Sequence, residues 1–148
     1  MKKGELLSKA IMLAVEAHSG QYDKGGNPYI LHPLKVMHWL RDEEEEVQAI
    51  GVLHDAVEDN KNFTFLRLMQ EGMTLRVVEG IRALTKMPGQ TYEEYRQVVM
   101  ANSDSVKVKM RDLRHNSDIR RLKGVTEKDI ARIAKYHAFY LELLALGT

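Results

Sequence analysis

The amino-acid sequence predicts an all-α fold, a helical bundle of about eight helices. Apolar residues recur at helical spacing along most of the 148 residues, and no segment shows the strict alternation that is typical of a half-buried strand. Glycine, asparagine and proline gather between the periodic segments, where they indicate loops. The length is that of one ordinary domain, so we expect residues 1–148 to form a single domain.

The first helix is expected to run to about His18, because apolar side chains keep helical spacing up to that residue. Residues 19–28 contain glycines, an asparagine and a proline, and they should form a loop. His32 and Pro33 are expected to open a second helix, since proline is favoured in a first helical turn, where its missing N–H is not needed.

A third helix is predicted over residues 42–59. It starts in the acidic run of residues 42–46, where negative charge suits the positive end of the helix dipole. Further helices are expected at residues 63–70, 75–84, 92–101, 104–122 and 126–146. Thr126 and Asp129 resemble a capping pair at the start of the last one.

The charge and the composition limit the possible partners. Lysine and arginine number 22 and aspartate and glutamate 21, a formal net charge of +1, so no overall field attracts nucleic acid or an anionic membrane, and we expect neither partner. The absence of cysteine excludes disulfides and thiolate metal sites and fits a reducing cytosol. There is no signal-peptide core and no apolar stretch of about 18 residues, and the expected location is the cytoplasm.

The most informative segment is residues 51–59, in which an apolar run leads into His54, Asp55, Glu58 and Asp59. On one helix, His54 lies one turn before Glu58 and Asp55 one turn before Asp59, so the polar groups share one broad side. Burying them without compensation is costly, and a divalent cation would remove that cost. The alternative is a solvated acidic helix end beside a histidine satisfied within the core.

Two further clusters contain residues of metal-ligand type. Asp112 shares a helical face with His115 and Asn116 in a segment apolar enough to be partly buried. His32 stands at a helix start. Taken alone, Asp112 indicates a cap or an ion-pair partner of Arg111 or Arg114, and His32 indicates a structural histidine.

These clusters belong to a longer set of motifs in residues 10–120, namely Ala17-His18-x-Gly20-Gln21, Pro28-Tyr29-Ile30-x-His32-Pro33-Leu34, Leu53-His54-Asp55-x-x-Glu58-Asp59, Leu84-Thr85-Lys86 and Lys109-Met110-x-Asp112 with His115-Asn116. With this H…HD…D pattern the chain resembles the HD superfamily of metal-dependent phosphohydrolases. In particular, it resembles the hydrolase domain of the Rel/Spo alarmone enzymes and of the small alarmone hydrolases.

The resemblance implies a role for each of the site residues. The metal ligands would be His32, His54, Asp55 and Asp112. The acidic pair that orients or deprotonates the attacking water would be Glu58 and Asp59. The substrate contacts would be Lys24 and Asn116. The ion in this family is typically manganese, although two imidazoles and two carboxylates would also accept iron, cobalt or zinc.

The chain departs from the alarmone pattern in its nucleotide pocket. Asp23 stands where the family has an arginine that contributes to the base pocket, while the lysine that follows it is retained as Lys24. Leu113 stands where the family has an arginine, which is shifted here to Arg114. Ile119 replaces a threonine near the nucleotide. The metal ligands are therefore retained while the pocket is altered.

The implied activity is hydrolysis of guanosine 3′,5′-bis(diphosphate), ppGpp, at its 3′-pyrophosphate, a reaction of the stringent response. One alternative is a phosphohydrolase for another nucleotide, such as an adenine alarmone, a nicotinamide dinucleotide phosphate or a nucleoside monophosphate. Another is a nucleotide-binding module without turnover, which would not need Glu58 and Asp59. The base preference, the physiological metal and the oligomeric state stay open.

Overall fold

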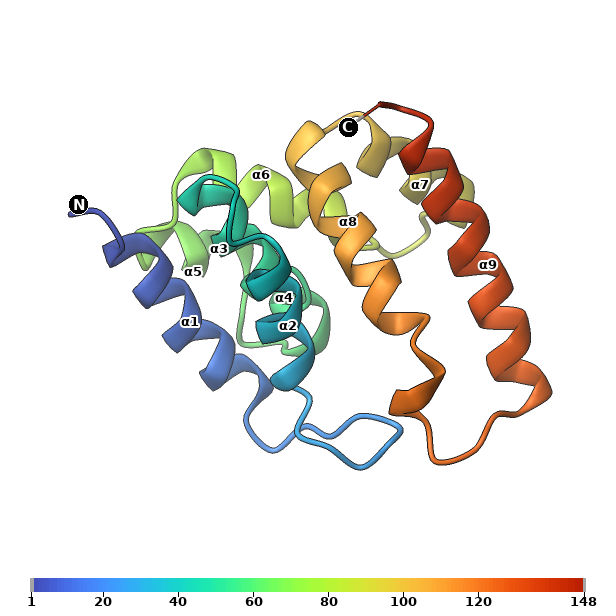
Figure 1. Ribbon diagram of the computed structural model, residues 1–148. Helices are drawn as coiled ribbons and strands as arrows, with labels where there is room; N and C mark the ends of the chain where they lie inside the picture. The colour runs from blue at the N-terminus through green and yellow to red at the C-terminus, as the bar shows by residue number, and fades with distance from the viewer. Residues whose placement is uncertain (1, 148) are drawn as a thin grey trace.

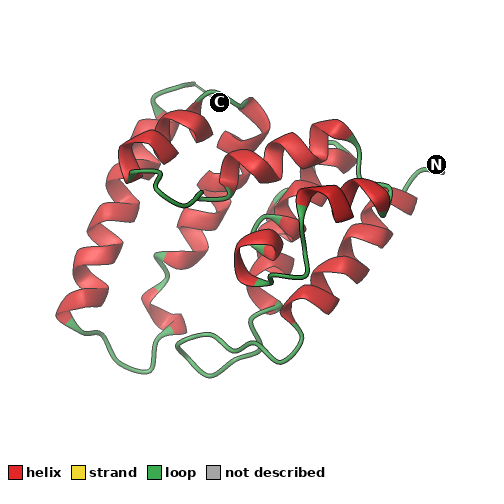
Figure 2. Ribbon diagram, turned by 180° about the vertical axis from the view of Figure 1, so that it is seen from behind, coloured by secondary structure: helices red, strands yellow, loops and turns green. Residues whose placement is uncertain are grey.

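The computed structural model describes residues 2–147, and within that range the chain forms nine α-helices and one 3₁₀ turn, η1 (Figure 1). The bounds are α1 Glu5–His18, α2 Leu31–Trp39, α3 Glu45–Leu53, α4 Ala56–Asp59, α5 Phe65–Gln70, α6 Leu75–Leu84, α7 Tyr92–Met100, α8 Ser103–Asn116, η1 Ile119–Arg121 and α9 Glu127–Leu144. Figure 2 shows no strand in the described part, and the one β-type pairing there is an isolated bridge between Tyr22 and Pro28. The predicted all-α fold is confirmed.

Two helices organise the packing. α3 contacts α1, α2, α6 and α8, and α8 contacts α2, α3, α6, α7 and α9. The buried side of α3 is continuous, because Ala49, Ile50, Val52 and Leu53 are all fully buried. A functional side chain near the end of α3 or on the inner face of α8 therefore sits on a rigid support.

The prediction of one continuous helix over residues 42–59 is wrong. α3 ends at Leu53, His54 and Asp55 form a turn, and α4 starts at Ala56. The ring nitrogen Nδ1 of His54 lies 2.6 Å from the carbonyl oxygen of Gly51, which a continuing helix would pair with the backbone N–H of Asp55. The imidazole takes that acceptor, and the helix breaks beside it.

The helix predicted over residues 104–122 is also too long. α8 ends at Asn116, and a 3₁₀ turn follows in which the side chain of Asp118 accepts the backbone N–H of Arg120. Arg121 donates to the carbonyl oxygen of His115, which lies in the last turn of α8 and also accepts the backbone N–H of Asp118. The expected cap of the last helix is confirmed, since Thr126 and Asp129 form a reciprocal capping box at the start of α9.

The loop between α1 and α2 and the connection between α8 and α9 lie at the same end of the molecule (Figure 1). They touch where Gly25 packs on the backbone of Arg121. None of the described helices is both long enough and apolar enough to cross a membrane.

Candidate metal centre

Four side chains from three parts of the chain converge in the centre of the bundle. His32 comes from the first turn of α2, His54 and Asp55 from the turn between α3 and α4, and Asp112 from α8. One ligand-type atom of each lies within 4.8 Å of the others. His32, His54 and Asp112 are buried, and Asp55 is partly buried. We call these residues the HHDD cluster.

The hydrogen bond of His54 fixes which of its ring nitrogens faces the HHDD cluster. A carbonyl oxygen only accepts, so the Nδ1 that contacts the Gly51 oxygen must carry the proton. In the neutral ring the other nitrogen, Nε2, presents a lone pair, and it lies 3.1 Å from Asp112 Oδ1 and 3.2 Å from Asp55 Oδ2. Three groups that all present lone pairs repel one another unless a proton or a cation lies among them.

His32 is arranged in the same way through a second histidine. Its Nδ1 lies 2.7 Å from Nδ1 of His115, and its Nε2 lies 2.9 Å from Asp112 Oδ1. Burial, followed by the charges of Arg121 and His32, lowers the pKa of His115 to about 4. A neutral His115 can accept a hydrogen bond from Nδ1 of His32, which again leaves the lone pair of Nε2 for the cluster.

Each carboxylate of the HHDD cluster has a donor outside the cluster. The Tyr29 hydroxyl donates to Asp55 Oδ2 over 2.6 Å, and the Lys109 ammonium donates to Asp112 Oδ2 over 2.8 Å. Burial alone would raise the pKa of both carboxyl groups, but the neighbouring cations outweigh it and hold both pKa values below the ordinary range. For Asp55 the largest opposing cause is His54, and for Asp112 it is Lys109.

The donor set fits a divalent cation. Two imidazole nitrogens and two carboxylates are ligands that zinc and the neighbouring transition metals accept, and four protein ligands leave room for water or substrate on an ion that takes six. The carboxylates also raise the pKa of His54 well above its usual value against the effect of burial, so a positive charge is favoured at this point. A bound cation would supply that charge without protonating the ring.

Glu58 and Asp59 stand beside the HHDD cluster at the end of α4. Burial, together with neighbouring carboxylates, raises the pKa of Glu58, and burial is the largest cause raising that of Asp59. Gln21 donates to Asp59 Oδ2 over 3.0 Å, and His18 Nδ1 lies 2.8 Å from Gln21 Oε1. His18 is buried, and it is therefore a core histidine that also contacts Gln21, the hydrogen-bond donor to Asp59.

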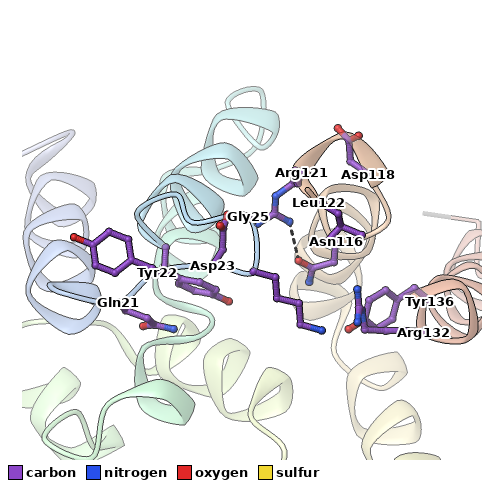
Figure 3. A pocket seen from close by; sticks show the side chains of 12 residues that line it. Gln21, Tyr22, Asp23, Gly25, Asn116, Asp118, Arg121, Leu122, Arg132 and Tyr136 are labelled. Carbon is purple, nitrogen blue, oxygen red and sulfur yellow. Dashed lines mark hydrogen bonds and ion pairs between the residues drawn. The ribbon is translucent and has the colours of Figure 1, made fainter. Parts of the chain in front are cut away.

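A cavity of about 310 Å³ lies between the loop after α1 and the region from the end of α8 into α9 (Figure 3). Three of its lining residues each bind a carboxylate of the site: Gln21 binds Asp59, Tyr29 binds Asp55, and Asn116 binds Asp112 over 3.0 Å. Lys24 lines the cavity, as do Arg132 and Tyr136 from α9. Both predicted substrate contacts, Lys24 and Asn116, thus lie on its wall.

The positions that depart from the alarmone pattern fall in different places. The side chain of Asp23 accepts the backbone N–H of Asn27 and lies 3.6 Å from Arg121 Nη2, so it is held in place on the cavity wall. Arg114 is exposed and stacks 4.1 Å from the Trp39 ring, away from the cavity. Leu113 is a core residue, and Ile119 is 54% exposed.

Sequence reasoning missed several residues that support the site. Tyr29 lies in a matched motif, and Lys109 precedes Asp112 by one helical turn, so either spacing could have indicated a partner for a carboxylate. Arg121 gave no such signal, because the predicted helix ran through it. Its position follows from the early end of α8.

Curated proteins with similar sequences include RSH1 of Arabidopsis thaliana, a chloroplastic protein whose name assigns it GTP diphosphokinase activity and which is 37% identical over 134 residues. Another is a guanosine-3′,5′-bis(diphosphate) 3′-pyrophosphohydrolase of Haemophilus influenzae, 32% identical over 137 residues. The matches cover 78% and 84% of this chain but 15% and 20% of the relatives, so the chain spans a fifth or less of their length. No family model matches the chain.

One solved structure is similar over almost the whole chain. It belongs to a metazoan orthologue of SpoT, described as hydrolysing ppGpp, and it has a TM-score of 0.77. The similarity covers 97% of this chain and 88% of that one at 20% sequence identity. The two chains therefore share a fold.

Proposed function

The chain belongs to the Rel/Spo family, of whose longer members it matches one segment, and from this premise we propose that it is a metal-dependent hydrolase of ppGpp. The reaction is removal of the 3′-pyrophosphate. The observation that carries the proposal is the HHDD cluster, in which lone pairs of two buried histidines and two carboxylates meet within 4.8 Å. The names and activities of the relatives support it.

His32, His54, Asp55 and Asp112 would hold the ion, and we propose that it is manganese. When bound, such an ion lowers the pKa of water and offsets the negative charge of a phosphate. The protein's own contribution is to fix the four ligands. Gly51 and His115 orient the two imidazoles, while Tyr29 and Lys109 hold the two carboxylates.

Glu58 and Asp59 act as the acid–base pair. One of these carboxylates accepts a proton from the attacking water, whose oxygen forms a bond to the phosphorus attached to the ribose 3′ oxygen. The bond between that phosphorus and the 3′ oxygen breaks, and the proton passes to the 3′ oxygen. The products are GDP and pyrophosphate, with one water consumed. The pKa values of Glu58 and Asp59 are raised, which brings both closer to the working pH. A carboxylate with such a pKa can both accept a proton and return it.

Lys24 and Asn116 bind the substrate from the cavity wall. The ammonium of Lys24 is exposed and can move onto a phosphate. The amide of Asn116 already donates to Asp112 and accepts from Arg121, so its contribution is to link the substrate to the HHDD cluster.

A turnover screen with manganese tests the function. ppGpp, its adenine counterpart, a nicotinamide dinucleotide phosphate and a nucleoside monophosphate are incubated with the protein, and pyrophosphate and orthophosphate are measured separately. We expect ppGpp to give pyrophosphate and GDP in equal amounts. Pyrophosphate from the adenine counterpart, or orthophosphate from the nicotinamide dinucleotide phosphate or the nucleoside monophosphate, with ppGpp untouched, would replace this function by another phosphohydrolase activity. No release from any of the substrates would leave a binding module.

A further inference from the structure

The cavity between the loop after α1 and the end of α8 has one basic side chain that is held in place from several directions. Three basic residues line it: Lys24, Arg121 and Arg132. Lys24 is exposed, and Arg132 is bound to Asp129 over 2.7 Å. The side chain of Arg121 is 22% exposed and has contacts on two sides of its guanidinium.

The contacts of Arg121 join the loop after α1 to the end of α8. Nη1 donates to the His115 carbonyl oxygen over 3.0 Å and to Asn116 Oδ1 over 3.1 Å. Nη2 lies 3.6 Å from Asp23 Oδ2. Figure 3 shows Arg121 above Asn116 on the cavity wall, with the hydrogen bond between them drawn. The guanidinium is therefore positioned before any ligand arrives, which lowers the entropy lost on binding.

The guanidinium also keeps donors for a ligand. It has five N–H groups, and its two hydrogen bonds to acceptors in residues 2–147 use only Nη1. The distance to Asp23 is longer than a hydrogen bond. Asp23 thus orients the cation without occupying its N–H groups.

The place of Arg121 indicates which part of the substrate it can meet. Asn116 lies between it and the HHDD cluster, because Asn116 binds Asp112 on one side and Arg121 on the other. A group bound to Arg121 is therefore separated from the reacting phosphorus by the width of that side chain. ppGpp has a second diphosphate, on the 5′ oxygen of the same ribose, that is not cleaved.

We propose that Arg121 binds the 5′-diphosphate of the nucleotide and that Asp23 is its positioning residue. The ligand class is a nucleoside 5′-diphosphate. The inference rests on the proposed function for the orientation of the substrate, but the guanidinium site can be measured without turnover, because GDP carries the same 5′-diphosphate.

The test is calorimetric titration of GDP into the full chain loaded with manganese, for the wild type, Arg121→Gln, Asp23→Asn and Arg120→Gln. Arg120→Gln is the matched control, since it removes the same charge from the neighbouring residue, which is 87% exposed and paired with Asp118. Losing hydrogen bonds to a charged group should weaken GDP binding of Arg121→Gln about tenfold or more. Asp23→Asn keeps the guanidinium, so it should weaken GDP binding by less than about threefold. Arg120→Gln should bind GDP as the wild type does.

Equal losses in Arg121→Gln and Asp23→Asn would mean that Arg121 only anchors the loop, and would overturn the inference. Unchanged GDP binding in Arg121→Gln, or no GDP binding by the wild type, would overturn it as well. Thermal unfolding of each variant identifies any that fail to fold. If Arg121→Gln fails to fold, Arg121→Lys replaces it. This variant keeps the charge but loses the planar fork, so it should also bind GDP more weakly than the wild type. Absence of ppGpp hydrolysis with normal GDP binding would remove the proposed function and keep the 5′-diphosphate site.

Discussion

At the scale of single residues, both histidines of the HHDD cluster have one ring nitrogen committed to a protein partner. The Gly51 carbonyl holds His54, and His115 holds His32. This second layer of hydrogen bonds orients the ring and selects the tautomer that a metal needs. It also explains why a histidine three residues after Asp112 is part of the site without being a ligand.

His115→Ala is expected to weaken metal binding about 10- to 100-fold, the usual effect of losing such an outer partner. His32 would keep its place in α2 but lose the acceptor for its Nδ1 proton. Metal affinity measured by competition with a chelator checks this result. The control is His38→Ala, at an exposed histidine on α2, the helix that carries His32. Equal metal affinities of His115→Ala and His38→Ala would contradict the role of His115.

Glu58→Gln and Asp59→Asn should keep the metal and lose turnover by about 10²-fold or more, the scale of a positioned acid or base. Both residues lie beside the ligands and outside the set whose atoms converge. Metal content and kcat for ppGpp are measured together. The control is Glu79→Gln, at an exposed glutamate on α6. Wild-type rates in both variants would mean that the acidic pair is only structural.

At the scale of elements, the site depends on two places where a helix ends early. The break after Leu53 puts His54 and Asp55 in a turn, and the end of α8 at Asn116 lets Arg121 fold back. Apolar periodicity predicted most helices well, and the expected range 75–84 equals the observed α6. It could not predict these two ends, because side-chain hydrogen bonds to carbonyls end the helices there, and periodicity contains no information on such bonds.

Gly25 tests the contact between the loop after α1 and the connection after α8. A β-carbon on Gly25 would overlap the carbonyl oxygen of Arg121, which is backbone and cannot move aside alone. Forcing in a methyl group typically costs about 1–3 kcal/mol, so Gly25→Ala should raise KM for ppGpp about tenfold while the metal content stays unchanged. Gly124→Ala, where a β-carbon meets nothing within 4 Å, is the control. A normal KM for Gly25→Ala would mean that this contact does not shape the cavity.

At the scale of the whole molecule, the site lies where the two central helices meet. α3 and α8 pack on each other and on most other helices, so the core that stabilises the fold also supports the HHDD cluster. The sequence motifs indicated which residues belong together, since they matched a known spacing. The supporting residues Tyr29, Lys109 and Arg121 were not predicted, because their roles depend on which segments meet in three dimensions.

The metal content of Asp55→Ala tests the central claim most directly. Removing one ligand leaves the other buried groups of the HHDD cluster without the cation that compensates them. Elemental analysis of the purified wild type and of Asp42→Ala, a control at an exposed aspartate, should find about one divalent ion per chain, and Asp55→Ala should retain almost none. Equal metal content in Asp55→Ala and the wild type would contradict the assignment of the HHDD cluster as the metal centre.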